Sequence, residues 1–142
     1  MSNAVKPAPA GDPATREYWE AASRGEFRIP LCTACGRHHL YPRTICPHCG
    51  SSALAWSDSP GTGEVYSYTV VHRAPSPAFE ADVPYVVAVI QLDEGPHLMT
   101  NLLDITPEAV RIGQRVRVAF RAAGEDGALI PVFKPDEGPG AP

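Results

Sequence analysis

The chain has 142 residues, of which 44% are hydrophobic, and its formal net charge is −4. These values are typical of one globular domain or two small ones. No apolar run approaches the roughly 18 residues that a membrane span needs, and residues 1–5 lack the charged and apolar regions of a signal peptide. We therefore expect a cytoplasmic protein with reduced thiols and no membrane contact.

The charge is unevenly distributed along the chain. Residues 24–50 contain four arginines against one glutamate, a net charge of +3, whereas residues 51–142 carry a net charge of −6. The central segment is therefore the locally basic part of the chain, and this asymmetry bears on the partners that it could bind.

A short helix is predicted near the N-terminus. Residues 1–12 are rich in Ala, Pro and Gly and are expected to form a disordered tail. Asp12 is a suitable N-cap, with Pro13 at the first helical position. The pattern continues to Ser23, and Gly25 is expected to end the helix.

Two aromatic side chains, Tyr18 and Trp19, lie on one face of this predicted helix. A helix of about three turns is marginally stable alone. Its aromatic side chains must therefore be buried, either on the protein's own core or on a partner subunit. Both possibilities are open, so Tyr18 and Trp19 are candidates for a partner interface.

All four cysteines occur in two Cys-x-x-Cys pairs, Cys32/Cys35 and Cys46/Cys49, and each pair is followed by glycine. Such a pair places two thiolates on one tight turn, and the glycine permits the positive φ that directs N–H groups toward the sulfurs. Four thiolates complete a tetrahedral shell around Zn²⁺ and leave no position for water or substrate. The predicted metal site is therefore structural rather than catalytic.

Other uses of these cysteines fit the sequence less well. Two disulfides would need an oxidising compartment, and no signal peptide points to one. A redox pair would need a thioredoxin-like βαβ context, which the pattern lacks. His38, His39 and His48 are close in sequence, but four cysteines make a histidine ligand unnecessary, so these side chains are expected at the surface or beside the metal.

Short strands are predicted around the two metal-binding turns, at residues 27–31, 37–41 and 53–56. Pro42 should stop the second of them. Residues 57–61 are expected to link this part to the rest of the chain.

From residue 61 onward, β-branched and aromatic residues indicate strands. Five strands are predicted, with a short helical turn at residues 106–110 between the third and the fourth: residues 63–73, 85–92, 97–103, 115–121 and 129–133. This order matches a small Greek-key barrel of the OB type. The expected fold is mainly β, with a helix and zinc ribbon at residues 13–57, an OB-fold barrel at residues 58–135 and a disordered tail at residues 136–142.

Several sequence segments occur in the order seen in one known family. They are residues 18–21, residues 25–27, the two metal-binding turns, residues 61–72, residues 112–118 and residues 129–133. Over residues 13–135 the chain resembles the family that joins a rubredoxin-like zinc ribbon to an OB-fold, acyl-CoA-associated domain, long filed as domain of unknown function thirty-five.

The resemblance implies an accessory role rather than catalysis by this chain alone. Members of that family occur beside thiolase-like and aldolase-like proteins of lipid, steroid side-chain or polyketide-type metabolism, and some are joined to enoyl-CoA hydratases. They help to form the site or path for the CoA thioester. The implied assembly is a hetero-oligomer with two accessory chains on a dimeric partner. Only the four zinc ligands are carried over: Cys32, Cys35, Cys46 and Cys49.

The basic segment supplies candidates for binding CoA. Arg28, Arg37 and Arg43 could form charge-assisted hydrogen bonds with its phosphates. Arginines in such a segment are also commonly just solvated, so this role is a hypothesis.

Two functions of other classes are alternatives. Single-stranded nucleic-acid binding needs a basic groove with stacking aromatic side chains. No Lys or Arg lies between Arg73 and Arg111, a stretch that includes the two strands on which an OB fold normally binds, so the sequence argues against nucleic acid. An enzyme acting alone would need an activated nucleophile, but the chain has no Ser-His-Asp or Cys-His signature.

Overall fold

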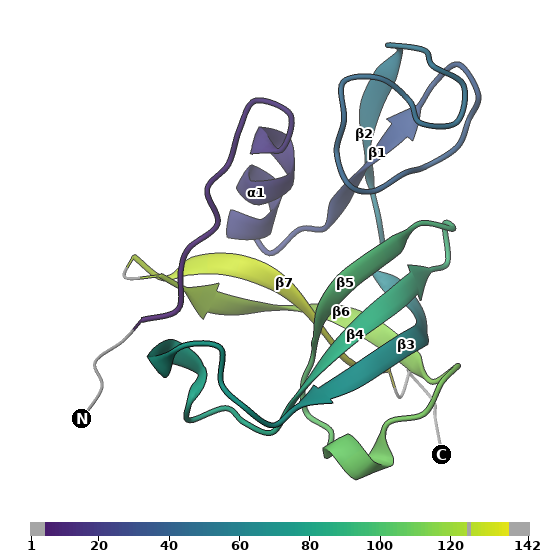
Figure 1. Cartoon of the computed structure of the whole chain (residues 1–142). Helices are drawn as coiled ribbons and strands as arrows, with labels where there is room; N and C mark the ends of the chain where they lie inside the picture. The colour runs from purple at the N-terminus through teal and green to yellow at the C-terminus, as the bar shows by residue number, and fades with distance from the viewer. Residues whose placement is uncertain (1–4, 125, 137–142) are drawn as a thin grey trace.

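The structure is a computed structural model that describes residues 5–124 and 126–136. It consists of one helix and seven strands, together with two short 3₁₀ helices (Figure 1). In chain order they are α1 (Arg16–Ser23), β1 (Arg28–Cys32), β2 (Leu54–Asp58), β3 (Thr62–Val71), η1 (Pro77–Phe79), β4 (Tyr85–Leu92), β5 (His97–Leu102), η2 (Pro107–Ala109), β6 (Arg115–Ala123) and β7 (Ala128–Pro135).

Helix α1 begins later than its sequence predicts. The N-cap is Thr15 rather than Asp12. The Thr15 N–H donates to the Asp12 carboxylate over 2.9 Å, and the Asp12 N–H donates to the Thr15 hydroxyl over 3.0 Å. These reciprocal bonds close a turn before the helix, so the predicted start at Asp12 is wrong by three residues.

The C-terminal end of α1 is as predicted. Gly25 has a φ of 73°. Its N–H donates to the Ala22 carbonyl, and the N–H of Glu26 donates to the Ala21 carbonyl, each over 2.9 Å. This pair of bonds is a Schellman motif, which requires a residue that tolerates positive φ.

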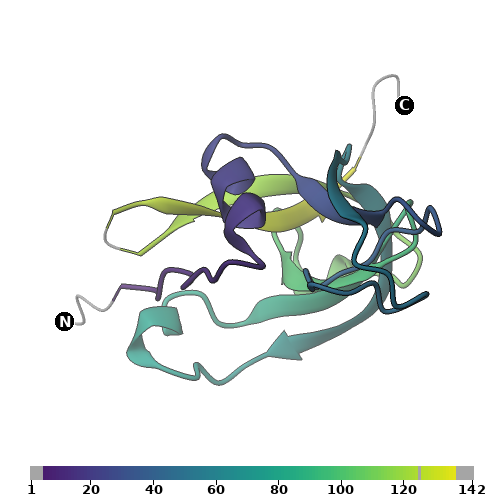
Figure 2. The same cartoon turned by 90° about the horizontal axis from the view of Figure 1, so that it is seen from above.

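The five strands β3 to β7 form a closed barrel in the order β3-β4-β5-β7-β6. Four of the five contacts between strands are antiparallel, and the fifth is a parallel pairing of β5 with β7 at Leu102 and Phe133. Helix η2 lies between the third and fourth barrel strands. The prediction of a five-stranded OB-fold barrel is confirmed, and Figure 2 shows the barrel from above.

Along β4 and β5, buried side chains alternate with half-buried or exposed ones, so one face of each strand covers the core. Every second residue of β4, from Val86 to Leu92, points into the core, and β5 repeats the pattern from Leu98 to Leu102. Strands β6 and β7 pair antiparallel as far as Ala123 with Ala128, and Glu125, between them, lies outside the described residues.

The ribbon differs from its prediction in one strand and in the predicted linker. Residues 37–41 form no strand, because after a single bridge between Leu31 and His38 the chain turns away from β1. The two hydrogen bonds of this bridge run from the Cys32 N–H to the Arg37 carbonyl over 3.0 Å and from the His39 N–H to the Pro30 carbonyl over 3.3 Å. Strand β2 pairs with β1 as far as Asp58, so two residues of the predicted linker are strand.

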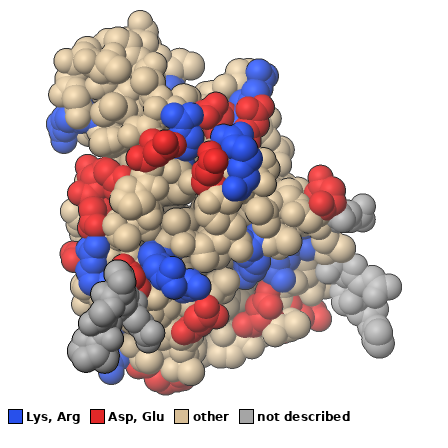
Figure 3. Space-filling view, turned by 180° about the vertical axis from the view of Figure 1, so that it is seen from behind, with Lys and Arg blue, Asp and Glu red and all other residues tan. Residues whose placement is uncertain are grey.

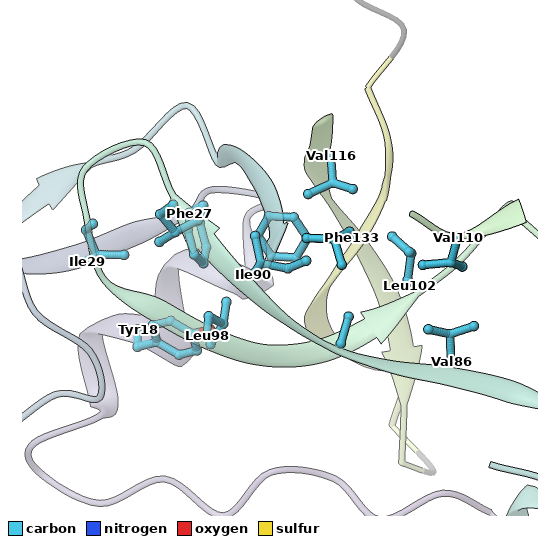
Figure 4. Packing of buried hydrophobic residues seen from close by; sticks show 13 residues of the cluster. Tyr18, Phe27, Ile29, Val86, Ile90, Leu98, Leu102, Val110, Val116 and Phe133 are labelled. Atoms are coloured by element: carbon cyan, nitrogen blue, oxygen red, sulfur yellow. The ribbon is translucent and has the colours of Figure 1, made fainter. Parts of the chain in front are cut away.

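One hydrophobic core joins the N-terminal part to the barrel. Tyr18 of α1 and Phe27 lie in the same cluster as Phe133 of β7 (Figure 4). The rings of Phe27 and Phe133 meet edge to face with centroids 6.1 Å apart, and Tyr18 contacts Phe27 in the same way at 6.1 Å. The N-terminal part and the barrel are therefore packed together, through α1 and Phe27, rather than merely linked.

Part of the predicted N-terminal tail follows the barrel surface. The Gly124 N–H donates to the Lys6 carbonyl over 2.9 Å, and the Lys6 ammonium lies 2.8 Å from the Asp82 carboxylate. Residues 1–4 and 137–142 of the predicted tails lie outside the described residues.

An exposed ion pair links the turn after β4 to β6. Arg115 donates two hydrogen bonds of 2.8 and 2.7 Å to the Asp93 carboxylate, and Thr62 donates a third of 2.7 Å. These bonds, those from Arg115 first, lower the pKa of Asp93 from 3.8 to about 2. Since the folded-state pKa is the lower one, this stabilisation is complete above about pH 4 and is lost as the pH falls toward about 2.

We therefore predict that Asp93→Asn flattens the acid limb of the stability curve. The loss at neutral pH should be small because both side chains are about half exposed to solvent. Urea titrations across the acid range measure the effect, with Glu80→Gln as the control, because Glu80 forms no ion pair in the described residues. An unchanged acid limb in Asp93→Asn would contradict the prediction.

Candidate metal centre and functional surfaces

The four cysteine sulfurs converge in the ribbon. Cys32 ends β1, Cys35 follows on the first turn, and Cys46 and Cys49 come from the second turn. All four sulfurs lie within 4.8 Å of one another, with 3.6 Å from Cys32 to Cys49 and 3.8 Å from Cys35 to Cys46. A tetrahedral zinc site with Zn–S bonds of about 2.3 Å places its sulfurs about 3.8 Å apart. The donor set therefore fits Zn²⁺.

The backbone of both turns supports this cluster as predicted. The N–H of Cys35 donates to the Cys32 sulfur over 3.4 Å, and the N–H of His48 donates to the Cys46 sulfur over 3.3 Å. Gly36 and Gly50 have φ values of 76° and 79°, so each turn depends on its glycine.

The thiols have unequal affinities for protons. Backbone N–H groups, that of Cys35 first, lower the pKa of Cys32 to about 7. At Cys49 the N–H of Ser51 acts in the same direction, but contact with Cys32, burial and the other two thiols together raise the pKa to about 11. Four thiolates repel one another, so a bound cation is needed to keep all of them ionised, and metal affinity should fall as the pH falls.

The three candidate arginines have different environments. Arg28 forms ion pairs with Glu17 at 2.6 Å and with Asp58 at 2.8 Å, so it connects α1 to β2 and is already paired. Arg37 and Arg43 form no ion pair within residues 5–124 and 126–136. They line one pocket between the ribbon and the β4–β5 turn.

The histidines near the metal centre also differ from one another. His48 is exposed and its ring lies 3.2 Å from the His38 carbonyl oxygen. His39 is only 3% exposed, so of its two expected places, at the surface or beside the metal, the surface is excluded. Its N–H donates to the Pro30 carbonyl over 3.3 Å, which turns the side chain inward. This hydrogen bond belongs to the bridge between Leu31 and His38. The sequence pattern does not indicate that the His39 ring is buried as a result.

An apolar groove of about 630 Å³ lies between α1, the N-terminal segment and the barrel. Trp19 and Tyr41 form part of its wall, together with Met99 of β5. The Tyr41 hydroxyl accepts a hydrogen bond of 3.0 Å from the Met99 N–H, yet the side chains of Tyr41 and Met99 are 52% and 62% exposed. Tyr18 is buried in the chain's own core, which leaves Trp19 as the more accessible of the two predicted interface residues.

Comparison with known proteins identifies the family. Residues 19–55 match the rubredoxin-like zinc ribbon domain of ChsH2, and residues 56–121 match the C-terminal OB-fold domain of ChsH2. A DUF35 domain-containing scaffold protein of Methanocaldococcus jannaschii is 41% identical over 97 residues, which is 68% of each chain. The chain belongs to the DUF35 family.

A solved structure adds a close structural relative of this DUF35 protein. A chain of the Ltp2-ChsH2(DUF35) aldolase matches with a TM-score of 0.80 and 41% sequence identity, over 90% of this chain and 98% of that one. The two chains therefore share one overall fold.

A longer relative contains a region similar to this DUF35 protein. The probable enoyl-CoA hydratase alpha subunit of Thermomonospora curvata is 42% identical over 132 residues. That alignment covers 93% of this chain but only 40% of the relative. In the described residues of the DUF35 protein no helix is both long and apolar enough to cross a membrane.

Proposed function

We propose that this DUF35 protein is an accessory subunit of an aldolase-like or thiolase-like enzyme that acts on acyl-CoA. The observation that carries the proposal is its 41% identity to a chain of the Ltp2-ChsH2(DUF35) aldolase, over 98% of that chain. In this proposal Zn²⁺ occupies the four-cysteine site and holds the ribbon in shape, while the partner carries out the reaction. The assembly is a hetero-oligomer with two accessory chains on a dimeric partner.

The apolar groove is the proposed contact with the partner. Large exposed apolar side chains on one face are typical of interfaces with other proteins. Met99 projects from β5, and Tyr41 and Trp19 flank it from the ribbon side and from α1. This combination of an aliphatic thioether and aromatic rings is enriched in the centre of protein interfaces.

The second candidate is a subunit of an enoyl-CoA hydratase. It is favoured by the 42% identity to a probable hydratase alpha subunit, in which the similar region is 40% of the length. The two candidates share the acyl-CoA substrate and differ in the enzyme that is bound.

Affinity purification of the tagged protein from its own cells tests both candidates. An aldolase or thiolase in near-equal amount supports the first proposal, and a hydratase in its place supports the second. Recovery of nucleic acid, or of no enzyme, contradicts both.

We further predict that Met99→Asp weakens retention of the partner about ten-fold or more, because it places a charge in an apolar contact. Ile112→Asp is the matched control, since Ile112 is 63% exposed and does not line the groove. Quantitative pull-down against wild type gives the ratio. Equal losses in both variants would show that the groove is not the specific contact.

A further inference from the structure

A second pocket, separate from the apolar groove, lies between the ribbon and the β4–β5 turn. Its volume is about 450 Å³, and its walls come from residues 36–48 of the ribbon and residues 94–96 of the barrel. Figure 1 shows the β4–β5 turn directly below the ribbon loops. We refer to this space as the basic pocket.

The charges around the basic pocket are mostly positive. Between Cys32 and Trp56 the chain has two arginines, Arg37 and Arg43, and neither Asp nor Glu. Both arginines line the pocket, and the ion pairs in the described part of the chain involve neither of them. In Figure 3 the ribbon is the lobe at the upper left, which is mostly tan.

His39 is the buried polar group of this pocket. It is 3% exposed, and neither of its ring nitrogens has a hydrogen-bond partner in the part of the chain that the structure describes. Burial, and then the neighbouring His48, Arg43 and His38, lower its pKa, so the ring is neutral and offers one N–H donor and one lone pair. An unpartnered buried imidazole is costly, which makes a ligand at this position favourable.

The barrel side of the pocket contributes a second unpartnered group. One carboxylate oxygen of Glu94 is buried and has no hydrogen-bond partner among the described residues. The pocket therefore combines two guanidinium groups, which only donate hydrogen bonds, with two groups that can accept one, His39 and Glu94. A carboxylate ligand supplies only acceptors. A phosphate that carries one proton supplies both several acceptor oxygens and an O–H donor.

We propose that the basic pocket binds a phosphate group, and that in the complex this is a phosphate of CoA. The guanidinium groups of Arg37 and Arg43 bind the phosphate oxygens, as planar donors do readily. His39 donates its N–H to a third oxygen, and the phosphate O–H is donated to Glu94 or to the free ring nitrogen. The identification of CoA as the source of the phosphate rests on the proposed function. The proposal that the pocket binds a phosphate does not depend on it.

Another role for the two arginines would be to offset the dianionic charge of Zn²⁺ with four thiolates. The two roles predict different effects of the same variant. If the arginines only balance the metal centre, Arg37→Gln/Arg43→Gln weakens zinc binding and has no effect on phosphate. If the arginines bind phosphate, the variant retains its zinc but no longer binds phosphate.

The test uses the zinc-loaded full chain with CoA, dephospho-CoA and inorganic phosphate in calorimetric titrations. We expect saturable binding of CoA that is about ten-fold or more weaker in Arg37→Gln/Arg43→Gln. Arg16→Gln/Arg73→Gln is the matched control, because these two arginines also lack an ion pair in the described residues and lie outside the pocket. The dephospho-CoA titration shows which phosphate is bound.

A second measurement follows the His39 ring in the wild-type protein. It therefore requires no substitution of this buried residue. In the NMR spectrum of wild-type protein, inorganic phosphate should shift the His39 ring resonances and leave those of His72 unchanged. Absence of this shift together with no CoA binding overturns the proposal, and phosphate binding without CoA binding overturns CoA as the source. CoA binding by a protein that purifies without an acyl-CoA enzyme would overturn the accessory role and support the pocket.

Discussion

Replacing Cys46 by serine is expected to abolish zinc binding and unfold the ribbon. Cys46 is 2% exposed and is one of the four cysteines whose sulfurs converge and could hold the metal. Structural zinc contributes about 10–16 kcal/mol to the folding of such small modules, and a ribbon of this size buries too little apolar surface to fold without it. Metal analysis and the loss of dispersed amide signals from residues 28–58 measure the effect.

The control for this prediction is His48→Gln, which changes a neighbouring side chain that is not expected to bind the metal. This variant should retain one zinc ion per chain. A loss of zinc in His48→Gln would make that histidine a ligand. Partner binding that persists in zinc-free Cys46→Ser would show that docking does not depend on the ribbon.

Truncation of Phe133 is expected to cause the largest loss of stability in the barrel. Its side chain is fully buried, and it contacts Phe27 at the point where the N-terminal part packs on the barrel. Large-to-small changes of this kind lower the free energy of unfolding by about 3–5 kcal/mol. Urea denaturation of Phe133→Ala followed by tryptophan fluorescence measures the change.

Ile112→Ala is the matched control for Phe133→Ala, because Ile112 is 63% exposed. We expect it to change the free energy of unfolding by less than about 0.5 kcal/mol. A loss of under about 1 kcal/mol in Phe133→Ala would contradict the shared core.

The cysteine pairs and the barrel strands were predictable from the sequence because their signals are local. Each Cys-x-x-Cys-Gly turn carries its own geometry, and β4 is a nearly continuous run of apolar residues, rich in β-branched side chains, that a turn follows. The predictions of a strand at residues 37–41 and of a helix start at Asp12 were wrong because their signals are not local. Their outcome depends on which of several hydrogen-bond partners is available in space, such as the bonds of Thr15 with Asp12.

The candidate site was predictable only in part. The convergence of the four cysteines follows from their spacing, but the environments of Arg28 and His39 do not. Arg28 binds Glu17 and Asp58, which are distant in sequence, and the burial of His39 depends on contacts that no periodic pattern encodes. Likewise, the groove beside Met99 is formed by segments far apart in the chain.

The parallel pairing of Leu102 with Phe133 also affects the order of folding. The β3-β4-β5 meander and the β6–β7 hairpin are local, but this pairing joins residues distant in sequence, and such contacts form slowly. Helix α1 packs on β7, the last strand of the barrel. During synthesis on the ribosome, the first helix must therefore wait for the last strand, and until then the edge of β5 is exposed to other chains.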